Sequence, residues 1–397
     1  FYLQGAAKNL PGGSFYAGAA SLLTLSSSKN TYIPQDAQRN YAMQYNFNAQ
    51  RQLAPSLTAM LGYVGSRAIH NVFRADDFNI VVPVKTSAGY LFPSPVGSGT
   101  VFNPHFGSIR DMSWAGSASY NSLEAEITKA MNHGIQLQGS FTWGKSIDQG
   151  SATEAGDQFS NALSSLPFYS LSSIQAPADF NVGRTVVVNA IWDVTTPKSW
   201  TGFTQLALGG WELGGIFTAT DGVPFTATFG TDGDPQGLNS SDPYDFPNRL
   251  TGPGCQSLVR AGNANSYIKT QCFTVPTAPS LAYWIANCDS AFGTPQNLQC
   301  FNLRGNAGRN ILTAPGLADF DFSLFKNIPI KRFSETFNIQ FRAEFFNVLN
   351  RANFSPPSLP GNTDIFDSTG APTGVAGLLT STATDNREVQ FALKVVW

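Results

Sequence analysis

Residues 40–50 of the chain, NYAMQYNFNAQ, largely alternate between polar and apolar side chains. Successive side chains of a β-strand point to opposite faces, so Tyr41, Met43, Tyr45 and Phe47 would share one face and the Asn and Gln residues the other. The same pattern returns in 337–345, FNIQFRAEF, and in 389–397, VQFALKVVW. Each of these segments predicts a strand with one apolar and one polar face.

Long segments of this kind recur along the chain and are separated by connections of two lengths. We predict nine strands, at 39–52, 56–69, 118–131, 134–148, 180–194, 208–220, 316–328, 334–349 and 386–397. Most exceed the usual five or six residues of soluble sheets, and their length suits strands tilted across a bilayer. The long connections, 70–117, 149–179, 221–315 and 350–385, all fall on one side of the predicted sheet. Short turns on one side and long loops on the other are typical of outer-membrane barrels.

The composition limits the class of protein. Only 13% of the 397 residues are charged, against roughly 25% in soluble domains, while 13% are aromatic. No apolar run approaches the roughly 18 residues that a membrane-spanning helix needs. A net charge of -2 argues against a nucleic-acid partner.

A soluble β-sandwich is the alternative, because it also has an apolar inner face and a polar outer face. Strand length and one-sided loops argue against it. Aromatic residues near predicted strand ends do so as well, since they suit a girdle at the membrane interface: Tyr63, Trp143, Trp192, Trp211 and Trp397. We therefore predict an all-β, antiparallel transmembrane barrel portion, with 1–38 as an extracellular loop remnant and 39–397 as the C-terminal part of the barrel, located in the outer membrane.

The four cysteines, Cys255, Cys272, Cys288 and Cys300, lie in the predicted external loop 221–315. An even, clustered number in a polar loop favours disulfides formed outside the cytoplasm. Zinc is the competing interpretation, but the ligand spacing of zinc sites is missing. The pairing stays open among three options, of which Cys255 with Cys272 and Cys288 with Cys300 is the simplest.

Several blocks, in order along the chain, resemble the barrel end of TonB-dependent outer-membrane receptors of the Oar-like kind. They are 45–53, YNFNAQRQL; 63–67, YVGSR; 120–125, YNSLEA; 139–148, GSFTWGKSID; 305–310, GNAGRN; 341–350, FRAEFFNVLN; and 390–394, QFALK. The resemblance covers residues from about 40 to 397.

The resemblance implies uptake of a scarce, bulky external ligand, with an internal plug released by the TonB energy-transducing complex. It also implies that the closing aromatic residue, Trp397, is read by the barrel-assembly machinery together with Phe391, Leu393 and Val395, although packing in the aromatic girdle is the alternative. The chain departs from the family in lacking a plug, and nine strands are fewer than the 22 of a plugged transporter. We therefore expect a fragment whose sheet has an unpaired edge.

Charged residues recur on the predicted polar faces of the strands. These are Glu124, Glu126, Asp319, Asp321, Arg342, Glu344 and Lys394. As an alternative function, the two acidic pairs could supply the acid and base of a secreted carbohydrate hydrolase. A charged lumen, with these carboxylates beside Arg342 and Lys394, is the stronger interpretation, because large barrels have polar interiors. No motif of nucleophilic, metal or dinucleotide chemistry occurs, so we predict no enzyme and no cofactor.

Another alternative function is that of a non-transporting barrel that serves as an anchor or adhesin through its loops. Asp232 and Asp234 are weak calcium candidates there, because their spacing matches the start of a calcium-binding loop. The rest of that motif is missing, which favours a solvated turn.

Overall fold

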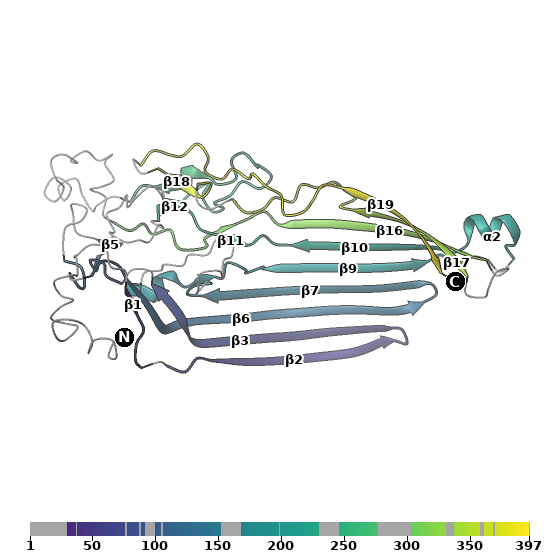
Figure 1. Cartoon of the computed structure of the whole chain (residues 1–397), viewed down its shortest axis with the longest axis horizontal. Coiled ribbons are helices and arrows are strands. Elements are labelled where there is room, and N and C mark those ends of the chain that lie inside the picture. Colours follow the sequence, from purple (N-terminus) through teal and green to yellow (C-terminus); the bar gives the residue numbers. More distant parts are fainter. Residues whose placement is uncertain are drawn as a thin grey trace, which may run out of the picture.

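The computed structural model describes residues 30–36, 38–75, 78–86, 89–91, 100–104, 106–151, 168–197, 199–229, 246–276, 303–330, 337–357, 361–367 and 370–396. Its main feature is a meander in which nine long strands follow one another in chain order, each antiparallel to the next (Figure 1). These strands are β2 (Tyr41–Ala54), β3 (Leu57–Ala75), β6 (Ile109–Asn132), β7 (Ile135–Asp148), β9 (Arg184–Asp193), β10 (Trp211–Thr220), β16 (Leu317–Pro329), β17 (Asn338–Phe346) and β19 (Glu388–Val396).

The predicted fold class is confirmed, and all nine predicted strands are found. The largest differences are at the ends of β3 and β6, which extend beyond the predicted 56–69 and 118–131. Their pairing shifts register between Ile69 and Asn71 and again between Asn71 and Phe73. A bulge breaks the two-residue alternation, so the periodicity ends before the strand does.

The pairing register places the apolar side chains of neighbouring strands on one common face. One row across the sheet runs through Trp192, Leu213, Leu324, Ala343 and Phe391, each directly opposite the next. The adjacent row, on the other face, contains Ser323, Glu344 and Gln390. A slip by one residue would exchange the two faces, so the sequence pattern fixes the register.

One end of the sheet, the turn end, carries the short connections. Between β6 and β7 the chain turns through His133 and Gly134, whose φ angles are 54° and 75°. Positive φ at both central residues is the mark of a type I′ hairpin, which matches the twist of the paired strands. A side chain at position 134 is excluded, because its Cβ would lie 2.3 Å from the backbone oxygen of Asp193.

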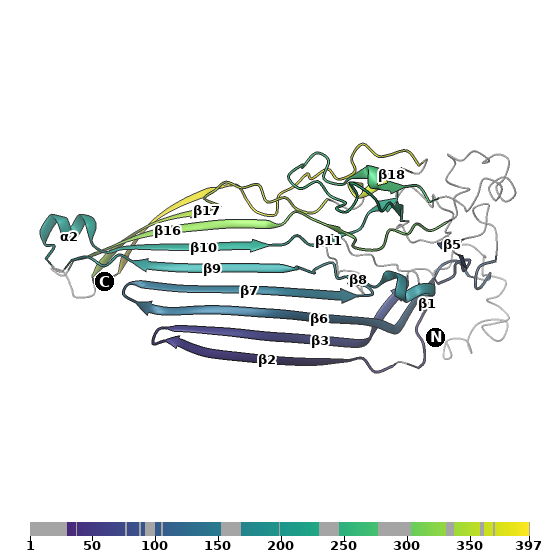
Figure 2. The same ribbon diagram turned by 180° about the vertical axis from the view of Figure 1, so that it is seen from behind.

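The connection between β9 and β10, also at the turn end, contains the helix α2 (Gly202–Leu208), seen beyond the strand ends in Figures 1 and 2. We predicted only a connection here, because seven residues are too few to show helical periodicity. In the described part of the chain, no helix is both long and apolar enough to cross a membrane.

The opposite end, the loop end, carries four long connections with short elements of their own. These elements are β4 (Val84–Thr86), β5 (Gly89–Leu91), η2 (Phe168–Ile174), β8 (Ala176–Pro177), β11 (Pro224–Phe225), β12 (Thr228–Phe229), β13 (Asn248–Arg249), η3 (Thr270–Cys272), β14 (Phe273–Thr274), β15 (Leu312–Thr313) and β18 (Asp364–Phe366). Figure 2 shows β5, β8, β11 and β18 among them, at the end of the sheet away from α2 and the C-terminus.

The main sheet is open, and β2 and β19 are its two edges. This agrees with the expectation of a sheet that has an unpaired edge. A further short strand, β1 (Asn30–Tyr32), lies in the segment predicted as a loop remnant. It pairs in parallel with Ile109–Asp111 at the loop end of β6.

Candidate functional site

The connections at the loop end fold together into one unit, which we call the cap. It comprises the described residues of 149–183, 221–316 and 347–387. The parallel pair of β12 and β18 joins the second and third of these connections. A buried apolar core unites all three and includes Ile174, Phe225, Phe229, Phe246, Ile268, Phe273, Leu312 and Ile365.

This core explains why long connections hold a defined structure. A sheet with one lipid-suited and one polar face buries few side chains of its own, whereas Phe225, Phe229, Ile268 and Ile365 are almost wholly buried in the cap. Full burial of such a side chain contributes about 1.5–3 kcal/mol. The cap is therefore a packed body at the loop end.

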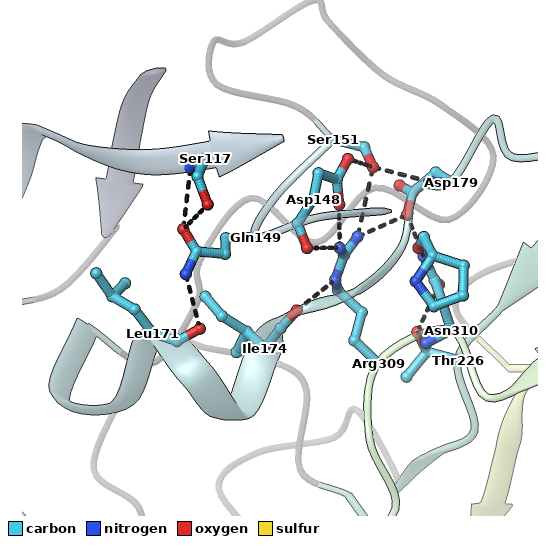
Figure 3. A network of polar contacts seen from close by, with 11 residues as sticks. Ser117, Asp148, Gln149, Ser151, Leu171, Ile174, Asp179, Thr226, Arg309 and Asn310 are labelled. Atoms are coloured by element: carbon cyan, nitrogen blue, oxygen red, sulfur yellow. Dashed lines mark hydrogen bonds and ion pairs between the residues drawn. The ribbon is translucent and has the colours of Figure 1, made fainter. Parts of the chain in front are cut away.

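A buried ionic cluster anchors the cap to the sheet (Figure 3). The guanidinium of Arg309, 1% exposed, forms ion pairs with Asp148, the last residue of β7, and with Asp179, its Nη1 lying 3.1 Å from Asp179 Oδ1. Arg309 also donates to the backbone oxygens of Asp148, at 3.0 Å, and Ile174, at 3.3 Å. One side chain thus joins a barrel strand to two cap connections.

The neighbouring residue, Asn310, extends this cluster. Its Nδ2 donates to Asp179 Oδ1 at 2.6 Å and to the backbone oxygen of Pro177 at 2.7 Å. Its backbone N–H donates to Thr226 Oγ1 at 3.0 Å. Asn310 has a φ of 57°, a left-handed conformation that Asn tolerates better than most residues. This backbone conformation directs the consecutive side chains of Arg309 and Asn310 toward the same buried site.

The cluster holds one cation against two carboxylates, so its net charge is negative. Burial raises the pKa of Asp179 to about 6, and the charge of Asp148 adds to the rise, whereas Asn310 and Arg309 act in the opposite direction. Asp179 Oδ2 has no hydrogen-bond partner within the described part of the chain, which leaves the cost of burial partly uncompensated. The cluster therefore favours a proton on Asp179 in mildly acidic solution.

Chemically, the cluster serves to hold the cap in place. A buried, fully occupied guanidinium offers no open position to a substrate. Across the described residues, no three His, Cys, Asp or Glu side chains are grouped so as to hold a metal ion.

Comparison with known proteins agrees with this architecture. The family described as "Outer membrane beta barrel domain" matches residues 3–390. The chain belongs to this family. Its barrel therefore lies in the outer membrane, with the apolar face of the sheet suited to lipid.

One solved structure similar to this outer-membrane barrel is that of the outer membrane transporter YddB from Escherichia coli. The identity is 11%, the match covers 94% of this chain and 34% of that chain, and the TM-score is 0.42. This chain thus spans about a third of that protein's length. No curated protein matches it by sequence.

In this barrel, the register places all seven predicted lumen residues on the polar face. On β6, Glu124 is paired with Gly62 and Thr142, and Glu126 with Met60 and Ser140. On β16, Asp319 is paired with Thr218, and Asp321 with Ile216. On β17 and β19, Arg342 is paired with Phe325 and Ala392, Glu344 with Ser323 and Gln390, and Lys394 with Gln340. Some of the seven form hydrogen bonds with polar neighbours: Gln138 Nε2 donates to Glu126 Oε1 at 3.0 Å, and Arg342 Nε donates to Gln340 Oε1 at 2.6 Å.

The expectation that the carboxylates lie beside Arg342 and Lys394 is wrong for one of the two acidic pairs. Asp319 and Asp321 are on β16, which pairs with β17, but Glu124 and Glu126 are on β6, whereas the two cations are on β17 and β19. Four strands, β7, β9, β10 and β16, lie between β6 and β17. No ion pair joins any two of the seven among the described residues. Sequence shows which face a residue occupies, but strand order decides its neighbours.

The remaining predicted site residues have mixed outcomes. Cys255 and Cys272 form a disulfide, with their Cα atoms 5.6 Å apart. Phe391, Leu393 and Val395 lie on the apolar face, opposite Ala343, Phe341 and Ile339. The other predicted positions, Cys288, Cys300, Asp232, Asp234 and Trp397, lie outside the described residues.

The ionic cluster is the site that sequence reasoning missed. Arg309 and Asn310 lie in the block 305–310, and Asp148 ends the block 139–148. The two blocks are about 160 residues apart in the chain, and nothing in the local pattern pairs them. A charged residue beside glycines in a loop is the one signal that could have drawn attention to Arg309.

Asp179 predicts how the stability of the cap depends on pH. Its pKa rises from 3.8 in the unfolded chain to about 6 in the folded cap, so between these values the folded state binds more protons. Its stabilising contribution is complete below pH 3.8 and is lost as the pH rises through about 6. The full difference corresponds to about 3 kcal/mol.

We expect slower hydrogen exchange in residues 303–316 at pH 5 than at pH 7.5, after correction for intrinsic exchange rates, and a smaller difference in Asp179→Asn. An equal pH dependence in both proteins would contradict the assignment to Asp179.

The disulfide gives a further prediction for the cap. Cys255 and Cys272 are 17 residues apart in sequence. A crosslink closing a loop of that size stabilises by about 3 kcal/mol. The double variant Cys255→Ser, Cys272→Ser should therefore be cleaved faster within 246–276 in limited proteolysis, while the heat-dependent gel shift of the barrel stays unchanged. Equal cleavage of variant and parent would show that the core holds this segment without the crosslink.

Proposed function

We propose that this chain supplies the wall, lumen lining and external cap of a TonB-dependent outer-membrane transporter that takes up a ligand from outside. The observation that carries the proposal is the cap, a packed body built from three loop-end connections and anchored to the barrel by Arg309. A fixed, folded surface at a barrel mouth suits recognition of a ligand before it enters. The resemblance of the sequence blocks to Oar-like receptors supports the same function.

The orientation that follows places the cap outside the cell. Outer-membrane barrels have short periplasmic turns and longer extracellular loops. The turn end, with α2 and the end of β19, would then face the periplasm, and the disulfide would lie on the external side. An external disulfide suits an oxidising environment.

The proposed passage lies along the polar face of the sheet. Carboxylates and cations are distributed over it on separate strands, with Glu124 and Glu126 on β6 and Arg342 and Lys394 on β17 and β19. Such a lining offers a ligand both signs of charge. The C-terminal segment with Phe391, Leu393 and Val395 would be recognised by the barrel-assembly machinery.

The test uses the protein in outer-membrane vesicles and in cells. Photo-crosslinking to TonB, together with uptake of fluorescent iron chelates, vitamins, glycans and peptides in cells with and without TonB, would support the proposal if one ligand enters only when TonB is present. An Arg309→Leu variant that loses uptake but keeps the barrel would assign recognition to the cap.

The cap also fits a non-transporting anchor or adhesin, since a packed loop surface can bind a partner without admitting it. The same experiment separates the two functions. Binding of a ligand at the cell surface that is unaffected by the loss of TonB, with no crosslink to TonB, would overturn transport and favour the adhesin.

A further inference from the structure

The helix α2 is an unusually apolar element for a turn between strands. Its sequence, GFTQLAL, contains no charged residue, and its three large apolar side chains are exposed: Phe203 by 82%, Leu206 by 53% and Leu208 by 52%. It lies beyond the turn end of β9 and β10, near the C-terminus (Figures 1 and 2). Exposed apolar side chains in such a group need a non-aqueous neighbour.

Two side chains of the barrel wall fix the C-terminal end of α2. Trp211 Nε1 donates to the backbone oxygen of Ala207 at 2.9 Å, and Lys326 Nζ donates to the same oxygen at 3.2 Å and to that of Gly209. The last carbonyls of a helix have no partner within it, and a cation suits the negative end of its dipole. Lys326 Nζ also lies 4.9 Å from the centre of the Trp211 ring.

The register shows on which side of the wall this attachment lies. Trp211 and Lys326 are directly opposite each other, and Lys326 is also opposite Phe341. Trp211 is in phase with Leu213, and Lys326 with Leu324, so both belong to the apolar face. The helix is therefore held from the lipid-suited side of the wall.

The spacing within α2 groups most of its apolar residues on one side. Phe203, Leu206 and Ala207 are three and four positions apart, so they share one face of the helix. Thr204 and Gln205 lie away from that face, together with Leu208. An apolar helix face that continues the apolar face of a barrel wall matches the boundary between headgroups and acyl chains. Trp and a Lys with its stem along apolar surface are also typical of that boundary.

We propose that α2 is an interfacial anchor, lying in the periplasmic leaflet of the outer membrane with Phe203 and Leu206 inserted among the acyl chains. Its partner is lipid, because its surface is uncharged and continuous with the lipid-suited face of β10 and β16. The anchor would fix the depth and tilt of the barrel wall at these strands. This assignment of α2 depends on the orientation given under the proposed function, but it does not depend on the identity of a ligand or on TonB.

The test uses the full-length protein in vesicles of phosphatidylcholine that carry a nitroxide on the headgroup or along the acyl chain. The variants Phe203→Cys, Thr204→Cys and Phe391→Cys are each labelled with a polarity-sensitive fluorophore. The unsubstituted protein, labelled in the same way, gives the background from its own cysteines. We expect a blue-shifted, lipid-quenched signal at position 203, with quenching strongest from nitroxides at the headgroup end of the acyl chain, and a weaker effect at 204.

The label at position 391 separates failure of the inference from failure of the barrel assignment. Quenching at 391 without any at 203 would overturn the anchor and place α2 in water. Absence of quenching at 391 would instead overturn the lipid facing of the wall.

A second variant tests the attachment itself. Lys326→Met removes the cation that holds the end of α2 and should reduce both the blue shift and the quenching at 203, leaving 391 unchanged. An unchanged signal at 203 would overturn the role of Lys326 in holding the anchor.

Discussion

Replacing Arg309 by leucine should open the cap while the barrel stays folded. The substitution leaves Asp148 and Asp179, whose side chains are 5% and 0% exposed, as buried carboxylates without their cation. Removing one partner of a buried ion pair costs about 3–5 kcal/mol, because the remaining charge is unpaired and desolvated. The rate of backbone amide hydrogen exchange in 168–183 and 303–316 should increase by the factor exp(ΔΔG/RT), where ΔΔG is this loss of free energy. The heat-dependent gel shift of the barrel should persist.

Two variants make the interpretation specific. Arg309→Lys keeps the charge but loses the planar fork that reaches two carboxylates and two backbone oxygens, so an intermediate loss of protection is expected. Arg351→Leu changes an exposed arginine of the same cap and should leave exchange unaltered. Equal protection in Arg309→Leu and the parent protein would mean that the apolar core alone holds the cap.

Phe217→Arg and Thr218→Arg should have opposite consequences, although the two residues are adjacent in β10. Phe217 lies on the apolar face, opposite Val188 and Phe320, so an arginine there would meet lipid and cost about 2–4 kcal/mol near the bilayer midplane. Thr218 lies on the polar face, opposite Asp319, where an arginine gains a carboxylate partner. Urea unfolding of the barrel in vesicles measures both free energies.

This pair tests the facing of the wall at one depth, because both side chains leave the same strand within one residue. Phe217→Leu is the matched control, since it shortens the side chain without adding charge. Similar destabilisation by the two arginines would contradict the facing, and greater destabilisation by Thr218→Arg would reverse it.

The strands of the wall were predictable because successive residues of an outer-membrane strand face different environments, so that apolar and polar side chains alternate along it. Phe391, Leu393 and Val395 alternate with Gln390 and Lys394, and the structure places the two sets on opposite faces. The pattern failed at the loop ends of β3 and β6, where bulges interrupt the alternation. It also gave no sign of α2, whose seven residues complete only about two helical turns.

The cap was predictable as a set of loops but not as a body. Cys255 and Cys272 indicated a constrained segment, yet the pairing remained one of three options until the structure brought the two residues together. Asp148 ends a strand of the wall, whereas Asp179 and Arg309 come from two separate connections, and their meeting depends on how those connections pack on the sheet.

By itself, the sequence determined the strands, their faces, the one-sided long loops and hence the membrane barrel. These follow from local alternation, because each strand meets lipid on one side and polar surroundings on the other. Only the tertiary structure decided that the loops form a cap, that Arg309 anchors it, that Glu124 is far from Arg342, and that Trp211 and Lys326 hold α2 against the apolar face. The physical reason is that these contacts join residues distant in the chain, and no local period specifies which of them will pack together.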